Sequence, residues 1–302
     1  MLPPKLKPGD KIGIVAFAKR ISFLEIQNAI SVFKSWGLEV EIGQTIGAYW
    51  NQFGGNDEMR KDDIQAMIDD PEIKAIISAR GGYGSVRIID DIDFSSFRIK
   101  PKWIIGFSDI TTFHSHIHYN FGIPTIHATM PVFFPNNSEE SINSLKSVLM
   151  HETMEYSEIS SYGELCKNGK TTAEIVGGNL SILYSNCGSD SSIDTNGKIL
   201  FLEDLCEYLY ATDRMLQNLK RNNFFENLAG VIIGSFSDMK DSFIPFGKTA
   251  EEMIFDYVKH LEIPIFTGFP AGHINNNKAL ILGEKINMKV NNNRINLILK
   301  KG

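Results

Sequence analysis

The sequence predicts an α/β protein with an open, mostly parallel sheet, followed by a smaller C-terminal α/β domain that is rich in β-strand. Three observations lead to this prediction. Short apolar runs alternate with amphipathic helical patterns through the first half, a polar stretch interrupts them near the middle, and the chain ends in alternating residues around an Asn-rich turn. At 302 residues the chain is long enough for two domains of ordinary size.

The first half predicts strands and helices in alternation. Strands are expected at 11–17, 38–43, 73–79 and 102–107, and helices at 23–37, from Asn56 onward, and near 86–90. Asn56 is expected to cap its helix, because Asp57 and Glu58 follow where the helix dipole favours anions. The run at 73–79 is almost continuously apolar, as in a strand covered on both faces.

The second half predicts a further α/β unit. Helices are expected at 177–188, 212–228 and 249–261, the last two capped by Thr212 and Thr249, with strands at 197–204, 230–236 and 263–272 and a hairpin at 285–299. Residues 136–170 are polar and weakly periodic. We therefore expect domains at 1–150 and 171–302, joined by a connection at 151–170.

Composition and charge favour a small-molecule or peptide ligand. A net charge of -6 gives no reason to expect nucleic acid or an anionic membrane, which demand clustered Lys and Arg. The N-terminus resembles no secretory signal, and no window approaches the roughly 18 apolar residues of a spanning helix. The three cysteines show no C-x-x-C spacing. These features predict a cytoplasmic protein without disulfides or a thiolate metal site.

Polar residues that directly follow predicted strands are candidates for chemistry, because ligands of open α/β sheets bind at the carboxyl ends of the strands. Ser108, Glu203 and His273 all have this placement. A hydroxyl, a carboxylate and an imidazole are the groups that nucleophilic acyl transfer requires. Each also has a structural interpretation, since Ser108 could cap a helix, Glu203 could pair with Arg214, and His273 could be a packed loop residue.

A glycine-rich loop, ARGGYGS at 79–85, also follows a strand. Its glycines would let N–H groups converge on an anion or a developing oxyanion, although a plain tight turn is an equal alternative. The spacing matches neither common nucleotide-binding loop. His114, His116 and His118 offer at most two ligands on one helix face, so we expect them to pack rather than to bind a metal.

Five segments resemble the LD-carboxypeptidases, also called muramoyltetrapeptide carboxypeptidases, a family of serine peptidases. They are ARGGYGS (79–85), PKWIIGFSDIT (101–111), GGNLS (177–181), LFLEDLCE (200–207) and GFPAGH (268–273). The resemblance runs in order from about Lys11 to about Val290. It implies a flavodoxin-like N-terminal domain, a C-terminal β-rich domain, a homodimer and no cofactor.

The resemblance also implies roles for individual residues. Ser108 would be the nucleophile, His273 the general base and acid, and Glu203 its orienting partner, with the backbone N–H groups of Gly82 and Asp109 as the oxyanion hole. The substrate would be a murein tetrapeptide that ends in D-alanine, with diaminopimelate or lysine before it. Arg80 and Tyr83 are the candidates for substrate contacts, Arg80 because a guanidinium can grip a carboxylate.

Three alternatives differ from this hypothesis in testable ways. An α/β-hydrolase is disfavoured because its nucleophile motif, G-x-S-x-G, would need glycine at position 110, which is isoleucine here. A microcin C immunity-type peptidase would act on an aminoacyl-nucleotide. A non-catalytic small-ligand-binding protein would not react with a fluorophosphonate.

Overall fold

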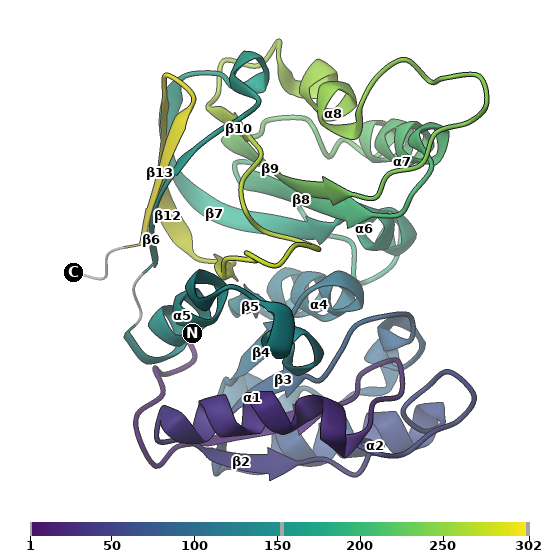
Figure 1. The fold of residues 1–302 in the computed structure, drawn as a ribbon, viewed down its shortest axis with the longest axis vertical. Coiled ribbons are helices and arrows are strands. Elements are labelled where there is room, and N and C mark those ends of the chain that lie inside the picture. The colour runs from purple at the N-terminus through teal and green to yellow at the C-terminus, as the bar shows by residue number, and fades with distance from the viewer. Residues whose placement is uncertain (1, 152–153, 300–302) are drawn as a thin grey trace.

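The computed structural model describes residues 2–151 and 154–299, which form two domains stacked one above the other (Figure 1). The N-terminal part contains β1 (Lys11–Val15), α1 (Phe23–Ser35), β2 (Glu39–Ile42), α2 (Asp57–Asp69), β3 (Ile73–Ser78), α3 (Ser95–Ile99), β4 (Trp103–Gly106), α4 (Thr111–Phe121), β5 (Thr125–His127) and α5 (Glu139–Lys146). Short 3-10 helices cover Ser85–Arg87, Ile89–Asp91, Ser108–Ile110 and Pro131–Asn136, and a π-helical turn covers Ser147–His151. None of the described helices is long and apolar enough to cross a membrane.

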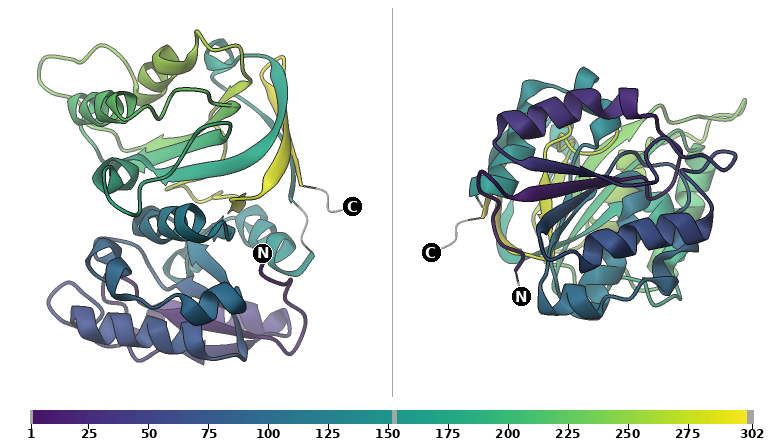
Figure 2. Two further views of the ribbon diagram at one scale, coloured as in Figure 1. Left: turned by 180° about the vertical axis from the view of Figure 1, so that it is seen from behind. Right: turned by 90° about the horizontal axis from the view of Figure 1, so that it is seen from below.

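The N-terminal sheet has the strand order β11-β5-β4-β3-β1-β2, in which only β11 (Leu280–Leu282) is antiparallel. Five parallel strands in the order 2-1-3-4-5 are the flavodoxin-like arrangement. Helices cover both faces of this sheet (Figure 2), and β1, β3 and β4 are accordingly buried almost throughout. The predicted fold class is confirmed.

The C-terminal part contains β6 (Met154–Ile159), β7 (Gly169–Asn179), α6 (Leu180–Asn186), β8 (Ile199–Leu205), α7 (Leu209–Arg221), β9 (Gly230–Ser237), α8 (Ala250–Val258), β10 (Ile265–Thr267), β12 (Lys285–Asn291) and β13 (Arg294–Leu299), with a 3-10 turn at Gly163–Leu165. Its seven strands are ordered β10-β9-β8-β7-β12-β13-β6. β10, β9, β8 and β7 pair in parallel, whereas β12, β13 and β6 pair antiparallel. The expected terminal hairpin is β12–β13.

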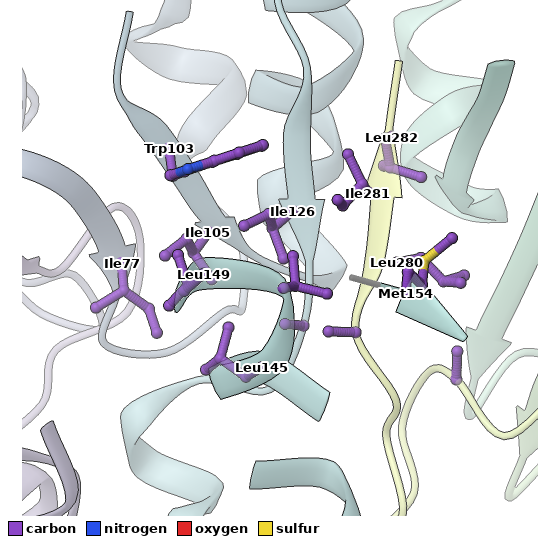
Figure 3. Packing of buried hydrophobic residues seen from close by; sticks show 14 of the residues in the cluster. Ile77, Trp103, Ile105, Ile126, Leu145, Leu149, Met154, Leu280, Ile281 and Leu282 are labelled. Carbon is purple, nitrogen blue, oxygen red and sulfur yellow. The ribbon is translucent and has the colours of Figure 1, made fainter. Parts of the chain in front are cut away.

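Two strands lie where the predicted domain limits did not place them. The expected connection at 151–170 contains β6, which pairs with β13. β11 belongs by sequence to the second domain but pairs with β5 of the first, where it covers the edge of the N-terminal sheet (Figure 3). An uncovered strand edge leaves backbone groups unpaired, and nothing in a three-residue apolar run reveals which edge it will cover.

Helix caps were predicted with mixed success. Asn56 Oδ1 accepts a hydrogen bond of 2.8 Å from the N–H of Met59, and Thr249 forms a capping box with Glu252, as expected. Thr212 is not a cap, because α7 begins three residues earlier and its N-cap is Tyr208. The buried Thr212 hydroxyl instead donates to the Tyr208 carbonyl at 3.3 Å, within the helix.

Candidate active site

Glu203 and His273 form a buried ion pair in the C-terminal domain. Glu203 lies in β8, and His273 lies in the loop that connects β10 to β11. The Nδ1 atom of His273 is 2.7 Å from Oε2 of Glu203, whose side chain is completely buried. A carboxylate in this position fixes the tautomer that carries the proton on Nδ1, which leaves Nε2 as the basic nitrogen.

The pKa of His273 is raised above its ordinary value of 6.5. Burial lowers this pKa, but the negative charge and hydrogen bond of Glu203, together with the charge of Asp204, raise it by more. The imidazole is therefore readily protonated when a proton is transferred to it, as a general base requires.

Gly272 is required for this pairing. Its φ is +123°, and a Cβ atom there would lie 2.8 Å from Oε2 of Glu203 and 2.4 Å from Oγ of Ser235. Any larger residue would displace the carboxylate from His273. Gly272, the second glycine of the GFPAGH segment, thus permits the close approach of the loop to β8.

Ser108 occupies a strained turn between β4 and α4. Its φ is +63°, in the left-handed region that non-glycine residues rarely adopt. The 3-10 helix Ser108–Ile110 has no side-chain cap, and the N-cap of α4 is Ile110, so the serine is not held there as a helix cap. A sharp turn of this kind between strand and helix exposes the side chain at the end of the sheet.

The Ser108 segment and His273 meet across the domain boundary. The ring of Phe107, the residue before Ser108, packs edge-on against the His273 imidazole with centroids 4.7 Å apart. A cavity of about 250 Å³ opens beside them, and its lining includes Phe107, Phe133, Leu205, His273, Ile274 and Asn277. Within the described residues no hydrogen bond joins Ser108 to His273; such bonds commonly tighten only when substrate is bound.

The glycine-rich loop lies directly over Ser108. A Cβ atom on Gly81 would be 3.3 Å from Oγ of Ser108, so only glycine allows this approach without pressure on the serine. Gly82 has a φ of +127°. In the described part of the chain, the N–H groups of Gly82 and Asp109 donate to no protein acceptor. Both donors are thus available to an anion bound beside Ser108.

The Asp109 side chain holds the glycine loop in place. Its buried carboxylate accepts hydrogen bonds from the N–H groups of Ser85 (2.9 Å) and Gly84 (3.3 Å). Burial raises the pKa of Asp109, while these bonds and the charge of Arg60 oppose the rise. From the other side, Nη1 of the buried Arg60 donates to the Gly84 carbonyl at 3.0 Å. The glycine-rich loop is therefore held by buried protein groups on both sides.

The GGN segment at the end of β7 connects the two domains, a role that sequence reasoning did not assign. Gly178 packs so closely on Thr111 that a Cβ atom would be 2.6 Å from its hydroxyl oxygen. The N–H of Asn179 donates to that hydroxyl at 3.1 Å, and its Nδ2 donates to Oδ1 of Asp204 at 2.9 Å. Burial and Glu203 raise the pKa of Asp204 to about 7.

The two candidates for substrate contact lie apart from the cavity lining. Nη1 of Arg80 donates to the Arg20 carbonyl at 3.3 Å and is 4.0 Å from Oε1 of Glu25, so the guanidinium is directed toward the start of α1. Tyr83 is half-exposed and packs against Phe53 with ring centroids 6.3 Å apart.

The three histidines of α4 have separate partners. His114 is buried, with Nε2 2.9 Å from the Gly106 carbonyl, and burial lowers its pKa to about 4. His116 contacts Ser191 at 3.0 Å, and His118 contacts Glu174 of β7 at 3.2 Å. Among residues 2–151 and 154–299, no group of three His, Cys, Asp or Glu side chains is arranged to hold a metal ion.

Family models match both domains. Residues 12–128 match the LD-carboxypeptidase N-terminal domain and residues 172–288 match the LD-carboxypeptidase C-terminal domain. The chain belongs to the LD-carboxypeptidase family.

Individual relatives cover nearly the whole chain. A probable murein peptide carboxypeptidase of Bacillus subtilis is 33% identical, with 95% of this chain and 91% of the relative covered. The murein tetrapeptide carboxypeptidase of Pseudomonas aeruginosa is 26% identical, with 91% of each chain covered.

Solved structures show the same fold. The muramoyltetrapeptide carboxypeptidase of Oxalobacter formigenes has a TM-score of 0.87 at 27% identity, covering 96% of this chain and 99% of the other. The microcin C7 self-immunity protein MccF, in complex with aspartyl sulfamoyl adenosine, also has a TM-score of 0.87, at 21% identity with 99% of each chain covered. At that identity the likeness concerns the fold alone.

Proposed function

We propose that the protein is a serine LD-carboxypeptidase that removes the terminal D-alanine from murein tetrapeptide. The main support is the buried Glu203–His273 pair, which packs through Phe107 against the strained turn at Ser108. The names of the relatives from B. subtilis and P. aeruginosa support the substrate class. Cytoplasmic location and a homodimer remain predictions of the same hypothesis.

In the proposed reaction, Oγ of Ser108 attacks the carbonyl carbon of the L-configured residue while its proton passes to Nε2 of His273. The N–H groups of Gly82 and Asp109 stabilise the oxyanion. His273 then gives the proton to the D-alanine nitrogen, the C–N bond breaks, and an ester remains on Ser108. Water, deprotonated by His273, hydrolyses that ester, and the proton returns to Ser108.

Mass spectrometry of L-Ala-D-Glu-(diaminopimelate or Lys)-D-Ala incubated with the protein tests the proposal. We expect tripeptide and free D-alanine with the wild type and intact tetrapeptide with Ser108→Ala. Unchanged tetrapeptide with a folded wild-type sample would refute the assignment. Hydrolysis of an aminoacyl-nucleotide in its place would indicate the microcin C immunity-type activity.

A fluorophosphonate probe separates a peptidase from a non-catalytic binding protein. The proposed function requires a covalent label on Ser108 that is absent from Ser108→Ala. If the folded wild type stays unlabelled, the serine is not an activated nucleophile.

A further inference from the structure

A carboxypeptidase has to recognise the free carboxylate at the end of its substrate. Only the amide nitrogen and one Cα separate that carboxylate from the scissile carbonyl carbon. A cation that binds the carboxylate must therefore lie within one side-chain length of Ser108. This requirement rests on the proposed function, and it limits the candidates to the basic residues around Ser108.

Lys19 meets the requirement of position. It lies in the loop after β1, and β3 separates β1 from β4 in the sheet, so this loop is two strand spacings, about 10 Å, from the Ser108 turn. Its side chain packs on Gly82 of the intervening glycine loop. A Cβ atom on Gly82 would be only 2.6, 2.7 and 3.1 Å from Cγ, Cδ and Cε of Lys19.

The residue that contacts the Lys19 side chain is thus the neighbour of the residue that contacts Ser108. Gly82 packs against the aliphatic part of the Lys19 side chain. Its neighbour Gly81 faces Ser108, and a Cβ atom on Gly81 would be 3.1 Å from Cβ of the serine. The absence of a side chain at Gly82 leaves room for the Lys19 side chain. The backbone of Lys19 forms a bridge to Phe53, which fixes the point from which the side chain starts.

Lys19 also meets the requirement of charge. Within residues 2–151 and 154–299 its ammonium group forms no ion pair and no hydrogen bond, and the side chain is half-buried. Three other basic side chains nearby are engaged: Arg60 and Arg87 both bind Asp57, and Arg80 is directed to Glu25 and the Arg20 carbonyl. Arg20 itself is exposed. A half-buried ammonium without a partner is suited to binding an anionic ligand.

We propose that Lys19 binds the terminal carboxylate of the peptide substrate and so determines the preference for a free C-terminus. The residue is a specificity determinant rather than part of the proton-transfer machinery. Its flexible four-carbon stem, anchored on Gly82, delivers a single positive charge beside the oxyanion hole. The same geometry disfavours Arg80 for this role.

The test compares two substrates and two enzymes. kcat/KM is measured for the tetrapeptide with a free C-terminal carboxylate and with a C-terminal amide, using wild type and Lys19→Met. The wild type should prefer the acid by about 10- to 100-fold, the range expected of a charge-assisted hydrogen bond. In Lys19→Met this preference should fall to near unity, and Lys19→Arg should restore part of it.

Two comparison variants complete the design. Lys289→Met makes the same charge change on the exposed face of β12 and should keep the wild-type preference. Arg80→Met decides between the two cations, since loss of the preference there and not in Lys19→Met would overturn the proposal. The rate of labelling by a neutral fluorophosphonate, which has no carboxylate, should be unchanged in Lys19→Met.

The outcomes separate this proposal from the proposed function. Equal losses on the acid and the amide in Lys19→Met would mean that Lys19 acts on the oxyanion or on the loop structure, and would overturn the carboxylate assignment alone. A wild type that cleaves the acid and the amide equally well would also overturn it. A wild type that cleaves neither peptide would refute the proposed function, and this proposal with it.

Discussion

Ser108 combines a strained backbone with a partly buried hydroxyl group at the end of the sheet. A φ of +63° costs a non-glycine residue roughly 1–2 kcal/mol, and the surrounding glycine loop and the buried Asp109 maintain it. Sequence reasoning left a helix cap and a nucleophile open at this position. The dihedral angle, together with the absence of a cap bond in the 3-10 helix, favours the nucleophile.

Strain at Ser108 predicts that two variants without the hydroxyl differ in stability. Both Ser108→Ala and Ser108→Gly remove the hydroxyl, but only glycine adopts a positive φ freely. After the greater chain entropy of glycine is subtracted, Ser108→Gly should be more stable than Ser108→Ala by about 1 kcal/mol. Urea unfolding of the two proteins measures the difference, and equal stabilities would mean that the turn is unstrained.

The Glu203–His273 pair predicts the acid limb of the pH–rate profile. The pKa of His273 is raised, and a general base must be neutral, so kcat/KM should fall as the pH drops through a midpoint above 6.5. Glu203→Gln removes the carboxylate that raises the pKa of His273, while burial still lowers this pKa. The midpoint should therefore move below that of the wild type. The maximal rate should also fall, by about 10²- to 10⁴-fold.

Steady-state kinetics between pH 5 and 9 on both proteins checks this prediction. Glu251→Gln removes another carboxylate of the C-terminal domain, in α8, and serves as the control. A midpoint that is the same in Glu203→Gln and wild type would show that the limb belongs to another group.

At the scale of elements, α4 lies between the two sheets (Figure 1) and links the Ser108 turn to the C-terminal domain. Its N-terminal residues follow Ser108, Thr111 accepts the bond from Asn179, and His118 contacts Glu174 of β7. The helix is therefore shared by both domains. The sequence predicted that its histidines pack, and His114 does so by bonding to the last residue of β4.

Burial of His114 predicts a loss of stability in acid. Its pKa is about 4 in the folded protein against 6.5 ordinarily, so the unfolded chain binds the proton more tightly and stability falls as the pH drops from 6.5 toward 4. The loss from this residue is about 3 kcal/mol. His127, whose pKa is also lowered well below the usual range, adds to it.

His114→Gln keeps a donor to the Gly106 carbonyl but does not titrate. The difference in unfolding free energy between pH 7 and pH 4.5 should be smaller in this variant than in wild type, as measured by urea unfolding at both pH values. His260→Gln, in the segment after α8, should respond like the wild type. An unchanged pH dependence in His114→Gln would assign the acid sensitivity to other groups.

At the scale of the whole molecule, one of the three apolar clusters is shared by both domains. A continuous cluster of buried side chains includes Trp103 and Ile126 of the first sheet, Met154 of β6 and Ile281 of β11 (Figure 3). Through β11 the C-terminal part of the chain completes the N-terminal sheet. The Ser108 turn and the Glu203–His273 pair are held in register by this shared core and by the Thr111–Asn179 link.

The shared core predicts that a substitution in β11 destabilises both domains together. Ile281→Ala should lower the free energy of unfolding by about 3 kcal/mol. The three tryptophans all precede residue 104, so their fluorescence reports on the N-terminal domain, while far-UV circular dichroism reports on both. The two unfolding curves should stay coincident in the variant.

Ile244→Ala provides the control for this experiment, because Ile244 lies in an exposed loop and should change stability by less than about 0.5 kcal/mol. Separate transitions for fluorescence and circular dichroism in Ile281→Ala would contradict a single cooperative unit.

The sequence by itself determined the elements whose signals are local. The apolar runs of β1, β3 and β4, the caps at Asn56 and Thr249 and the terminal hairpin were all predicted, because side-chain periodicity and capping chemistry act within a few residues. An expected strand-end placement singled out Ser108, Glu203 and His273 as candidates, although Glu203 lies within β8 and His273 lies in the loop after β10. Ordered motifs identified the family.

Tertiary structure alone decided what depends on contacts between distant segments. β11 was placed in the first sheet by its burial against β5, and the start of α7 was set by packing rather than by Thr212. Three contacts of this kind join residues 63 to 70 positions apart. They are the pairing of Glu203 with His273, the hydrogen bond of Asn179 to Thr111, and the contact of Lys19 with Gly82. Because these contacts form only when distant segments of the chain pack together, no local pattern in the sequence specifies them.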